Sequence, residues 1–348
     1  MLLTGLTIIN STENSITIDN DIDVELNFEN ALVFPGLVNS HDHLDFNLFP
    51  QLGNKKYNNY AEWGADIHEE NKKEISEVLK VPLPQRAQWG VYKNLLCGVT
   101  TVVNHGEKLE IQEPLITVIQ NTDALHSVKF EKFWRLKLLS PRRSEGVIAI
   151  HLGEGTDQQS KKEIDQYIRW NIFKRKTVAI HGVAMTAEQA KHFEALVWCP
   201  ESNFFLLGQT APIQNLKSKI KILFGTDSTL TSSWNIWDHI RTARKTGELN
   251  DSELINAVLS APSAVKQNIV VARTNSFFDI NPSDILLVIH QNQVRLFDES
   301  LLPPLSSTTF PLDNYKKVYL NNSKYVQGNI TGLVADIRRI LPNAKLPV

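Results

Sequence analysis

Short apolar runs separated by polar clusters mark both ends of the chain. They cover residues 6–9, 15–18, 285–297, 318–320 and 325–326. Runs of this length, rich in Ile, Val and Leu and bounded by Asn, Ser, Asp and Glu, are typical of strands. We expect strands from the two ends to pair in one small β domain made of residues 1–34 and 276–348.

The middle of the chain, residues 35–275, alternates helical stretches with buried strands. Helical patterns at 85–96 and 186–194 are followed by apolar strands at 100–103 and 195–198, and another strand is expected at 219–224. This alternation predicts a parallel sheet with crossover helices. The region suits a (β/α)₈ barrel of the TIM type, which typically takes about 250 residues. An open doubly wound sheet is the alternative, although the sequence has no Gly-rich phosphate-binding loop.

Composition narrows the function classes. The 348 residues carry 36 basic and 38 acidic side chains, with a net charge of -2 and no long run of one sign. We therefore expect no nucleic-acid or membrane partner. Cys97 and Cys199 lie far apart without metal-type spacing, and the N-terminal residues lack the features of a signal peptide. A cytoplasmic location is expected, since a reduced compartment is the simpler interpretation of two separate cysteines.

Candidate chemistry begins at the end of the first strand of the middle region. Pro35-Gly36 breaks the chain direction, and a short apolar run then leads into His41-Asp42-His43. Alternate residues of a strand point to one face, so His41 and His43 project together. Two adjacent imidazoles at the end of a buried strand suit a divalent metal. The alternative is a hydrogen-bonded pair without function.

Further polar residues follow the other expected strands. They are His105, His151, Glu154, His181 and Asp227. In a parallel barrel all strand C-termini meet at one face, where the active site lies. We therefore expect these side chains to converge, and chance placement of five of the ten histidines is a poor explanation.

The ordered set of motifs resembles the amidohydrolase superfamily, and within it the cytosine deaminase and triazine-chlorohydrolase-like aminohydrolases. The matching pieces are Pro35-Gly-Leu-Val-Asn-Ser-His-Asp-His43, Gly98-Val-Thr-Thr-Val-Val103, His151-Leu-Gly-Glu154, His181-Gly182, Cys199-Pro-Glu-Ser-Asn203 and Gly225-Thr-Asp-Ser228. Each motif alone is weak, but they occur in family order across nearly the whole chain. The resemblance implies a metal-dependent hydrolase barrel with a small β-sandwich domain built from both chain ends.

The resemblance also implies the roles of individual residues. His41, His43, His151 and Asp227 would bind one divalent ion, with zinc expected and iron the alternative. Such an ion lowers the pKa of bound water to about 7. Asp227 would accept the proton of that water, Glu154 would be the acid and base that serves a ring nitrogen and the leaving amine, and His181 would stabilise the developing oxygen. His105, His181 and Trp63 are the candidate substrate contacts.

Other interpretations of these residues remain open. Asp227 can be a helix cap, Glu154 a solvated carboxylate and His181 a core histidine, while a structural role for His105 is as reasonable as substrate contact. The other histidines match no motif and are interpreted as structural or surface residues; they are His68, His126, His192, His239 and His290. Cys199 is interpreted as a small buried residue.

Two departures from the family pattern concern the region before His151. Some members hold two metals bridged by a modified lysine, but Lys129, Lys132 and Lys137 lie in no recognisable motif, so one metal is favoured. Residues 107–146 must also supply two strands with their helices, and one βαβ unit alone takes about 30 residues or more. We predict a barrel that is trimmed between strands 2 and 5, with a missing or shortened helix.

The function expected is a deaminase acting on an amino-substituted nitrogen heterocycle such as a purine, pyrimidine or pterin. The alternatives are hydrolysis of chloride or an alkylamine from a triazine, hydrolysis of a cyclic amide, and a barrel that only binds a small ligand. A structural protein with scattered histidines is a further alternative. The expected partner is a small-molecule substrate, and a homodimer is one assembly open to the chain.

Overall fold

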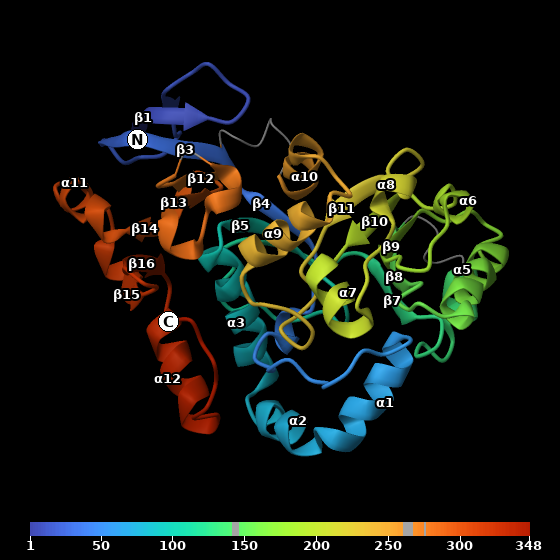
Figure 1. The fold of residues 1–348 in the computed structure, drawn as a ribbon. Coiled ribbons are helices and arrows are strands. Elements are labelled where there is room, and N and C mark those ends of the chain that lie inside the picture. The colour runs from blue at the N-terminus through green and yellow to red at the C-terminus, as the bar shows by residue number, and fades with distance from the viewer. Residues whose placement is uncertain (141–145, 260–266, 275) are drawn as a thin grey trace.

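A computed structural model describes residues 1–140, 146–259, 267–274 and 276–348 (Figure 1). Its strands form one eight-stranded sheet and two parallel sheets of five and three strands. Among the described residues no helix is both long and apolar enough to cross a membrane.

The eight-stranded sheet combines strands from both ends of the chain. In the order β15-β16-β14-β13-β12-β3-β1-β2 it contains Tyr315–Tyr319, Ser323–Gln327, Gln293–Asp298, Ile285–His290, Ile269–Ala272, Glu25–Pro35, Leu2–Ile8 and Ile16–Thr17. The antiparallel pair β3 and β12 joins the two ends, with Val33 opposite Val271. A division of this sheet into two facing layers stays a prediction, as do the domain bounds. Strand β12 lies inside the range 35–275 that was predicted for the barrel, but it pairs with β3 in the eight-stranded sheet.

Strand β3 buries both of its faces at its C-terminal end. Leu32 and Phe34 belong to the large core around the parallel strands, while Ala31 and Val33 belong to the core of the eight-stranded sheet. Successive side chains of a strand point to opposite faces, which explains why this strand ends in a continuous apolar run.

The parallel strands carry the middle of the chain. The five-stranded sheet has the order β11-β10-β9-β8-β7, with bounds Lys221–Phe224, Ala195–Trp198, Thr177–His181, Ile148–Leu152 and Asp123–Ser127, and the three-stranded sheet is β4 (Leu37–Asp42), β5 (Val99–Asn104) and β6 (Thr117–Ile119). A parallel bridge between Asp42 and Asp227 links the sheets beyond the end of β11, and the amide of Asp227 donates to the carbonyl of His41 at 3.0 Å. This link brings the first and last of the parallel strands side by side.

Helices flank these strands (Figure 1). Their bounds are α1 Tyr60–Glu70, α2 Lys72–Leu79, α3 Leu83–Leu96, α4 Trp134–Leu139, α5 Gln158–Trp170, α6 Ala187–Ala190, α7 Pro200–Leu207, α8 Ile213–Leu216, α9 Ile236–Thr246 and α10 Asp251–Val258. The helix expected at 186–194 is shorter, because the capping box of Thr186 and Gln189 starts α6 but only one turn follows.

The region 107–146 is shortened where it is described. No helix lies between β5 and β6, and residues 120–122 alone join β6 to β7. A crossover between neighbouring parallel strands takes a dozen or more residues, so this connection is too short for one. Accordingly, the described strands show no ladder between β6 and β7. Residues 141–145, which belong to the same prediction, lie outside the described residues.

The C-terminal region is not only β structure, and this part of the sequence interpretation was incomplete. It also contains α11 (Leu302–Ser306) and α12 (Ile330–Ile340). Ile330, Val334 and Ile337 are buried at the i, i+4, i+7 spacing of a helix face, and the side chain of Asn329 accepts from the amide of Gly332 to start α12.

Candidate metal centre

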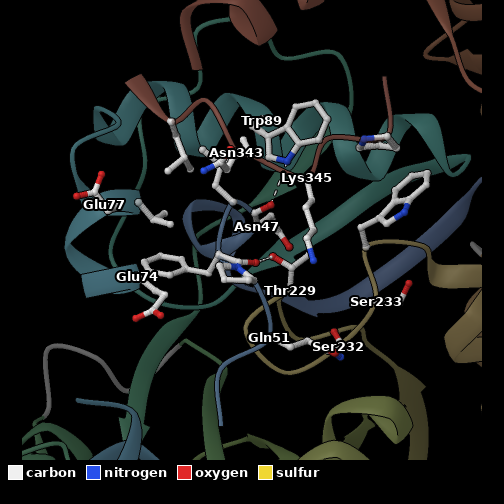
Figure 2. A pocket seen from close by; sticks show the side chains of 18 of the residues that line it. Asn47, Gln51, Glu74, Glu77, Trp89, Thr229, Ser232, Ser233, Asn343 and Lys345 are labelled. Atoms are coloured by element: carbon white, nitrogen blue, oxygen red, sulfur yellow. Dashed lines mark hydrogen bonds between the residues drawn. The ribbon is translucent and has the colours of Figure 1, made fainter. Parts of the chain in front are cut away.

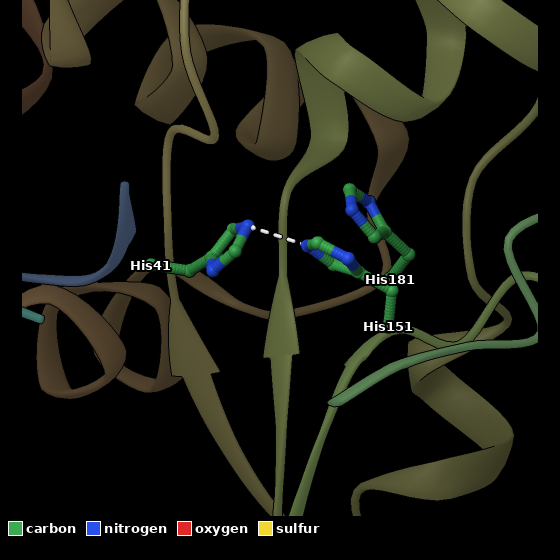
Figure 3. A group of neighbouring side chains, drawn as sticks. All are labelled: His41, His151 and His181. Carbon is green, nitrogen blue, oxygen red and sulfur yellow. Dashed lines mark hydrogen bonds between the residues drawn. The ribbon is translucent and has the colours of Figure 1, made fainter. Parts of the chain in front are cut away.

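The ends of the parallel strands bring histidines and a carboxylate together. His41 lies in β4, His151 in β8 and His181 at the end of β9, and Figure 3 shows the three rings turned toward one another. The Nε2 atoms of His41 and His151 are 3.2 Å apart. The ligand atoms of these three histidines lie within 4.8 Å of one another, as do those of His41, His43 and Asp227. The two groups share His41 and together contain every predicted metal ligand.

The spacing and protonation of these groups fit one divalent ion. Neighbouring ligand atoms of a tetrahedral zinc lie about 3.3 Å apart when metal–nitrogen bonds are about 2.0–2.1 Å. The Nε2 atoms of His41 and His43 lie 3.6 and 3.7 Å from Oδ1 of Asp227. Burial and then the neighbouring histidines lower the pKa of His43 to about 3 and that of His151 well below its usual value. These two imidazoles are therefore neutral, as metal ligands must be.

Asp227 is held as a carboxylate with one oxygen free for the centre. Its Oδ2 accepts from the hydroxyls of Ser202 at 2.8 Å and Thr231 at 2.9 Å, which leaves Oδ1 facing His41 and His43. Burial by itself raises the pKa of Asp227, but the surrounding histidines outweigh it and the net shift is downward. Ionisation and orientation therefore agree with a ligand rather than with a helix cap.

The backbone at this end of the strands adopts uncommon conformations. His181 has φ of 69° and Asp227 has φ of 60°. Residues other than glycine rarely occupy this region, and such strain is often found at functional sites.

Gly225 is required for a different reason. A Cβ there would lie 2.8 Å from Cγ1 of Val197 and 2.9 Å from Cβ of His41, so only glycine lets the chain beyond β11 approach β4.

Glu154 and His181 face each other beside the histidine cluster. Oε1 of Glu154 lies 3.6 Å from Nε2 of His181. The other ring nitrogen, Nδ1 of His181, lies 2.9 Å from Oδ1 of Asn203, an acceptor, so Nδ1 carries the proton and Nε2 keeps its lone pair. Burial, and then the charges of Asp227 and Glu163, raise the pKa of Glu154 well above its usual value. A raised pKa favours the protonated carboxyl, which is the form that can act as a general acid.

His105 lies among the ligands but not at the cavity. Its ring centroid is 4.4 Å from that of His151, and the residue is 2% exposed. Within the described part of the chain neither of its ring nitrogens has a hydrogen-bond partner. Burial lowers its pKa well below the usual value, so it is a neutral imidazole behind the centre. The residues that line the cavity do not include it, which gives no support to a substrate contact.

A cavity of about 660 Å³ opens over the centre. At its inner end lie His43, His151, Glu154, His181, Asp227 and Ser228, and its wall includes the predicted substrate contact Trp63 together with other side chains of α1 and α2. His126 also lines this cavity, with its ring 5.2 Å from that of His151. The sequence analysis had interpreted His126 as a structural or surface residue and so missed its position at the cavity. The only available signal was its position near the end of β7, in the region without motifs.

Asp42, between the two candidate ligands of β4, points away from the cavity into a buried polar network. Its Oδ2 accepts from Asn39 at 3.1 Å, Asn94 at 2.8 Å and Lys93 at 3.0 Å, and its Oδ1 accepts from Asn47 at 2.8 Å. The amide of Asn39 also donates to Oγ1 of Thr226 at 2.8 Å. Because Thr226 precedes Asp227, this network connects the segment that carries His41 and His43 to the segment that carries Asp227.

A second hollow lies on the other side of the 47–51 loop and belongs to no part of this centre. It has about 840 Å³ and is bordered by α2, residues 229–234 and the C-terminal segment 341–347 (Figure 2). Trp89 on α3 forms one wall and donates from Nε1 to the carbonyl of Asn47 at 3.0 Å. None of the predicted site residues is among those that line it.

The fold is similar to that of solved hydrolases, although sequence comparison finds no relative: no family model and no curated protein matches. A zinc-bound adenosine deaminase from Xanthomonas campestris has a TM-score of 0.66 at 14% identity, covering 99% of this chain and 98% of that chain. Atrazine chlorohydrolase from Arthrobacter aurescens in complex with zinc has 0.67 at 15%, covering 98% and 100%.

Guanine deaminase from C. acetobutylicum with bound guanine is a third similar structure. It has a TM-score of 0.59 at 12% identity, and the match covers 84% of this chain and 99% of that chain. At such identities the similarity establishes the fold and leaves the chemistry to the residues of this chain. The resemblance drawn from the motifs is confirmed at the level of the fold.

Proposed function

We propose that this chain, which has the fold of the amidohydrolase-superfamily deaminases and triazine hydrolases, is a metal-dependent hydrolase that removes an amino group from an amino-substituted nitrogen heterocycle such as a purine, pyrimidine or pterin. One observation carries the proposal. Side chains from distant strand ends form two ligand groups that share His41, one with His43 and Asp227 and one with His151 and His181. Glu154 and His181 face the cavity over these groups.

The residues that would hold the ion are His41, His43, His151 and Asp227. Zinc is the expected ion and iron the alternative, and one ion per chain fits the shared position of His41 in the two ligand groups. When bound, a divalent ion lowers the pKa of a coordinated water to about 7 and so supplies a nucleophile at neutral pH.

The chain's own groups would move the protons. Asp227, ionised and held by two hydroxyls, accepts the proton of the attacking water. Glu154, whose pKa is raised by burial, gives its proton to a ring nitrogen as the water attacks the adjacent carbon. The carboxylate so formed takes the proton of the added hydroxyl and passes it to the leaving amine, and the proton held by Asp227 then restores Glu154. His181 carries its proton on Nδ1, which donates to Asn203, so Nε2 is an acceptor that can orient the attacking water. In this tautomer it has no proton for the developing oxygen, so the stabilising role implied by the motifs would need a proton on Nε2.

The wider arrangement is proposed on the same basis. The two parallel sheets form one (β/α)₈-type barrel that is trimmed around β6 and β7, and the terminal sheet is the smaller domain. Two buried cysteines without a disulfide, Cys97 and Cys199, support a cytoplasmic location. The partner is a small molecule, and a homodimer is the assembly to test.

A second candidate within the same chemistry is release of chloride or an alkylamine from a triazine. The apolar wall of the cavity favours it, since a ring with alkyl groups fits such a wall. The attack on the ring would be the same for each leaving group, but chloride departs without a proton, so Glu154 would then serve only the ring nitrogen.

Ammonia release and metal content test the proposal. We expect about one ion per chain and ammonia from at least one aminopurine, aminopyrimidine or pterin, and we expect a chelator to abolish the release. Glu154→Gln should lower kcat at least 100-fold, since general acid–base groups contribute about 10²–10⁴-fold.

The matched control is Glu188→Gln, which changes an exposed carboxyl on α6 that does not line the cavity. It should leave activity unchanged. Full activity of Glu154→Gln on ring substrates would contradict the mechanism. A metal-free protein that binds these rings without turnover would instead establish the non-catalytic ligand-binding barrel.

A further inference from the structure

The outer half of the cavity differs from the metal centre in its chemistry. Beyond the centre, the wall is made of apolar side chains from α1, α2 and the adjoining loops; they include Phe46, Trp63, Ile67, Ile75, Leu79 and Phe130. A substrate whose reacting carbon lies at the centre would place its distal part against this wall. This half of the cavity therefore bears on the choice of substrate.

The polar atoms of the wall's aromatic residues are already used within the protein. Nε1 of Trp63 donates to the carbonyl of Leu52 at 2.8 Å, and the hydroxyl of Tyr60 lies 3.4 Å from Oε2 of Glu163. These residues consequently present ring carbons to the cavity and leave few groups to bind a polar substituent.

Two large apolar side chains at the cavity are unusually exposed. Leu79, at the end of α2, is 51% exposed, and Phe130, which follows β7, is 48% exposed. Phe130 packs against α1: its ring lies edge-on to Tyr60 at 5.2 Å between ring centroids and lies beside Gly64. Exposed apolar groups beside a binding cavity commonly mark a surface that a ligand covers.

The charges of the cavity argue against an ionic substituent. Of the described residues that line it, the only carboxylates are Glu154 and Asp227 at the centre, and the only lysine or arginine is Lys129. Phosphate and carboxylate groups are typically held by arginine forks or several donors at once. One exposed lysine is a weak substitute for such a site.

We propose, on the basis of the hydrolase function proposed above, that the substrate carries an uncharged alkyl or aryl group on the side of the ring away from the reacting carbon, and that the α1–α2 wall is its subsite. Ile75 and Leu79 of α2, with Phe130 opposite, determine this preference. The wall disfavours a sugar phosphate at this position, because the exposed Lys129 is the only lysine or arginine among the described residues that line the cavity.

A substituent series tests the subsite. Adenine, cytosine and melamine are compared as substrates with derivatives that carry a butyl or carboxypropyl group on a nitrogen away from the reacting carbon. Binding of the same compounds to Glu154→Gln is measured by calorimetry. On at least one ring we expect kcat/KM and affinity to rise about fourfold for each buried methylene, which corresponds to about 0.8 kcal/mol. The carboxypropyl compounds should lose this gain.

Variants at the wall locate the effect. Leu79→Ser and Ile75→Ser should bring the ratio of butyl to parent compound toward one, chiefly through KM. Leu83→Ser is the matched control, since Leu83 is also exposed, at 42%, and does not line the cavity. It should keep the wild-type ratio.

The outcomes separate this inference from the function on which it rests. If no compound releases ammonia, the deaminase proposal fails, and calorimetry with the butyl compounds still tests the subsite. If butyl and parent compounds behave alike, or the carboxypropyl compound is preferred, the apolar subsite is wrong while the deaminase proposal stands.

Discussion

At the scale of single residues, the feature that sequence motifs did not predict is the buried ion pair between Asp42 and Lys93. Asp42 is fully buried and Lys93 is 2% exposed, and the two residues lie 51 positions apart. Alternation along β4 correctly turned Asp42 away from His41 and His43. Nothing in the sequence around Asp42 indicates its partner, because Lys93 lies in α3.

Lys93→Met should destabilise the protein by about 3–5 kcal/mol, because it leaves a buried carboxylate without its countercharge. We expect the affinity for zinc to fall as well, by about 10–100-fold, since changes behind the ligands commonly have this effect. Denaturant unfolding of the metal-free protein and zinc competition with a chelator measure the two quantities separately.

The paired variant Asp42→Asn/Lys93→Met is the control for this prediction. It removes both charges and keeps one side-chain oxygen at position 42 that can accept from Asn94, so it should recover part of the lost stability. Equal losses in the single and double variants would show that the ion pair does not organise the centre.

At the scale of elements, continuous apolar runs were the most predictable. The strand expected at 195–198 is β10, and 85–96 lies within α3. Elements set by tertiary contact were predicted less well, since α12 was not expected and the helix expected at 186–194 is only Ala187–Ala190. His126 was missed for a related reason, since β7 lies in a shortened region where no family motif marks the strand end.

His290, at the end of β13, connects the terminal sheet to the parallel strands. Its Nε2 lies 3.2 Å from the hydroxyl of Thr117 in β6. Burial, and then the charge of Arg295, lower its pKa from 6.5 to about 4. The folded state therefore holds the neutral ring under conditions in which the unfolded chain already takes up a proton.

The pH dependence of stability follows from this difference. Between pH 6.5 and 4 the unfolded state binds more protons at this residue, so stability is complete above pH 6.5 and is lost as pH falls toward 4. The loss from His290 alone is at most about 3 kcal/mol. We expect the free-energy difference between wild type and His290→Gln to shrink by up to this amount over that interval, as measured by urea unfolding at several pH values. A difference independent of pH would contradict the assignment.

At the scale of the whole molecule, the candidate ligands belong to segments far apart in the sequence. His41 lies in β4 and His43 directly after it, His151 lies in β8, and Asp227 follows β11. Sequence alone predicted that these positions belong together through the order of the motifs. The length of residues 107–146 also predicted a trimmed region, but not that residues 120–122 alone would join β6 to β7. The roles of the residues stay predictions until they are measured.

An ion that joins these segments should stabilise the entire fold, since a ligand that binds only the folded state adds about 4.1 kcal/mol when present at 1,000 times its dissociation constant. Zinc should therefore raise the melting temperature of the metal-free protein, and the shift should be lost in His41→Ala and Asp227→Asn. His192→Ala removes an exposed histidine on the surface and should keep the full shift. Differential scanning calorimetry at fixed zinc concentrations measures this. If the ligand variants and His192→Ala respond equally to zinc, the stabilisation comes from surface binding, and the strand ends do not surround an ion.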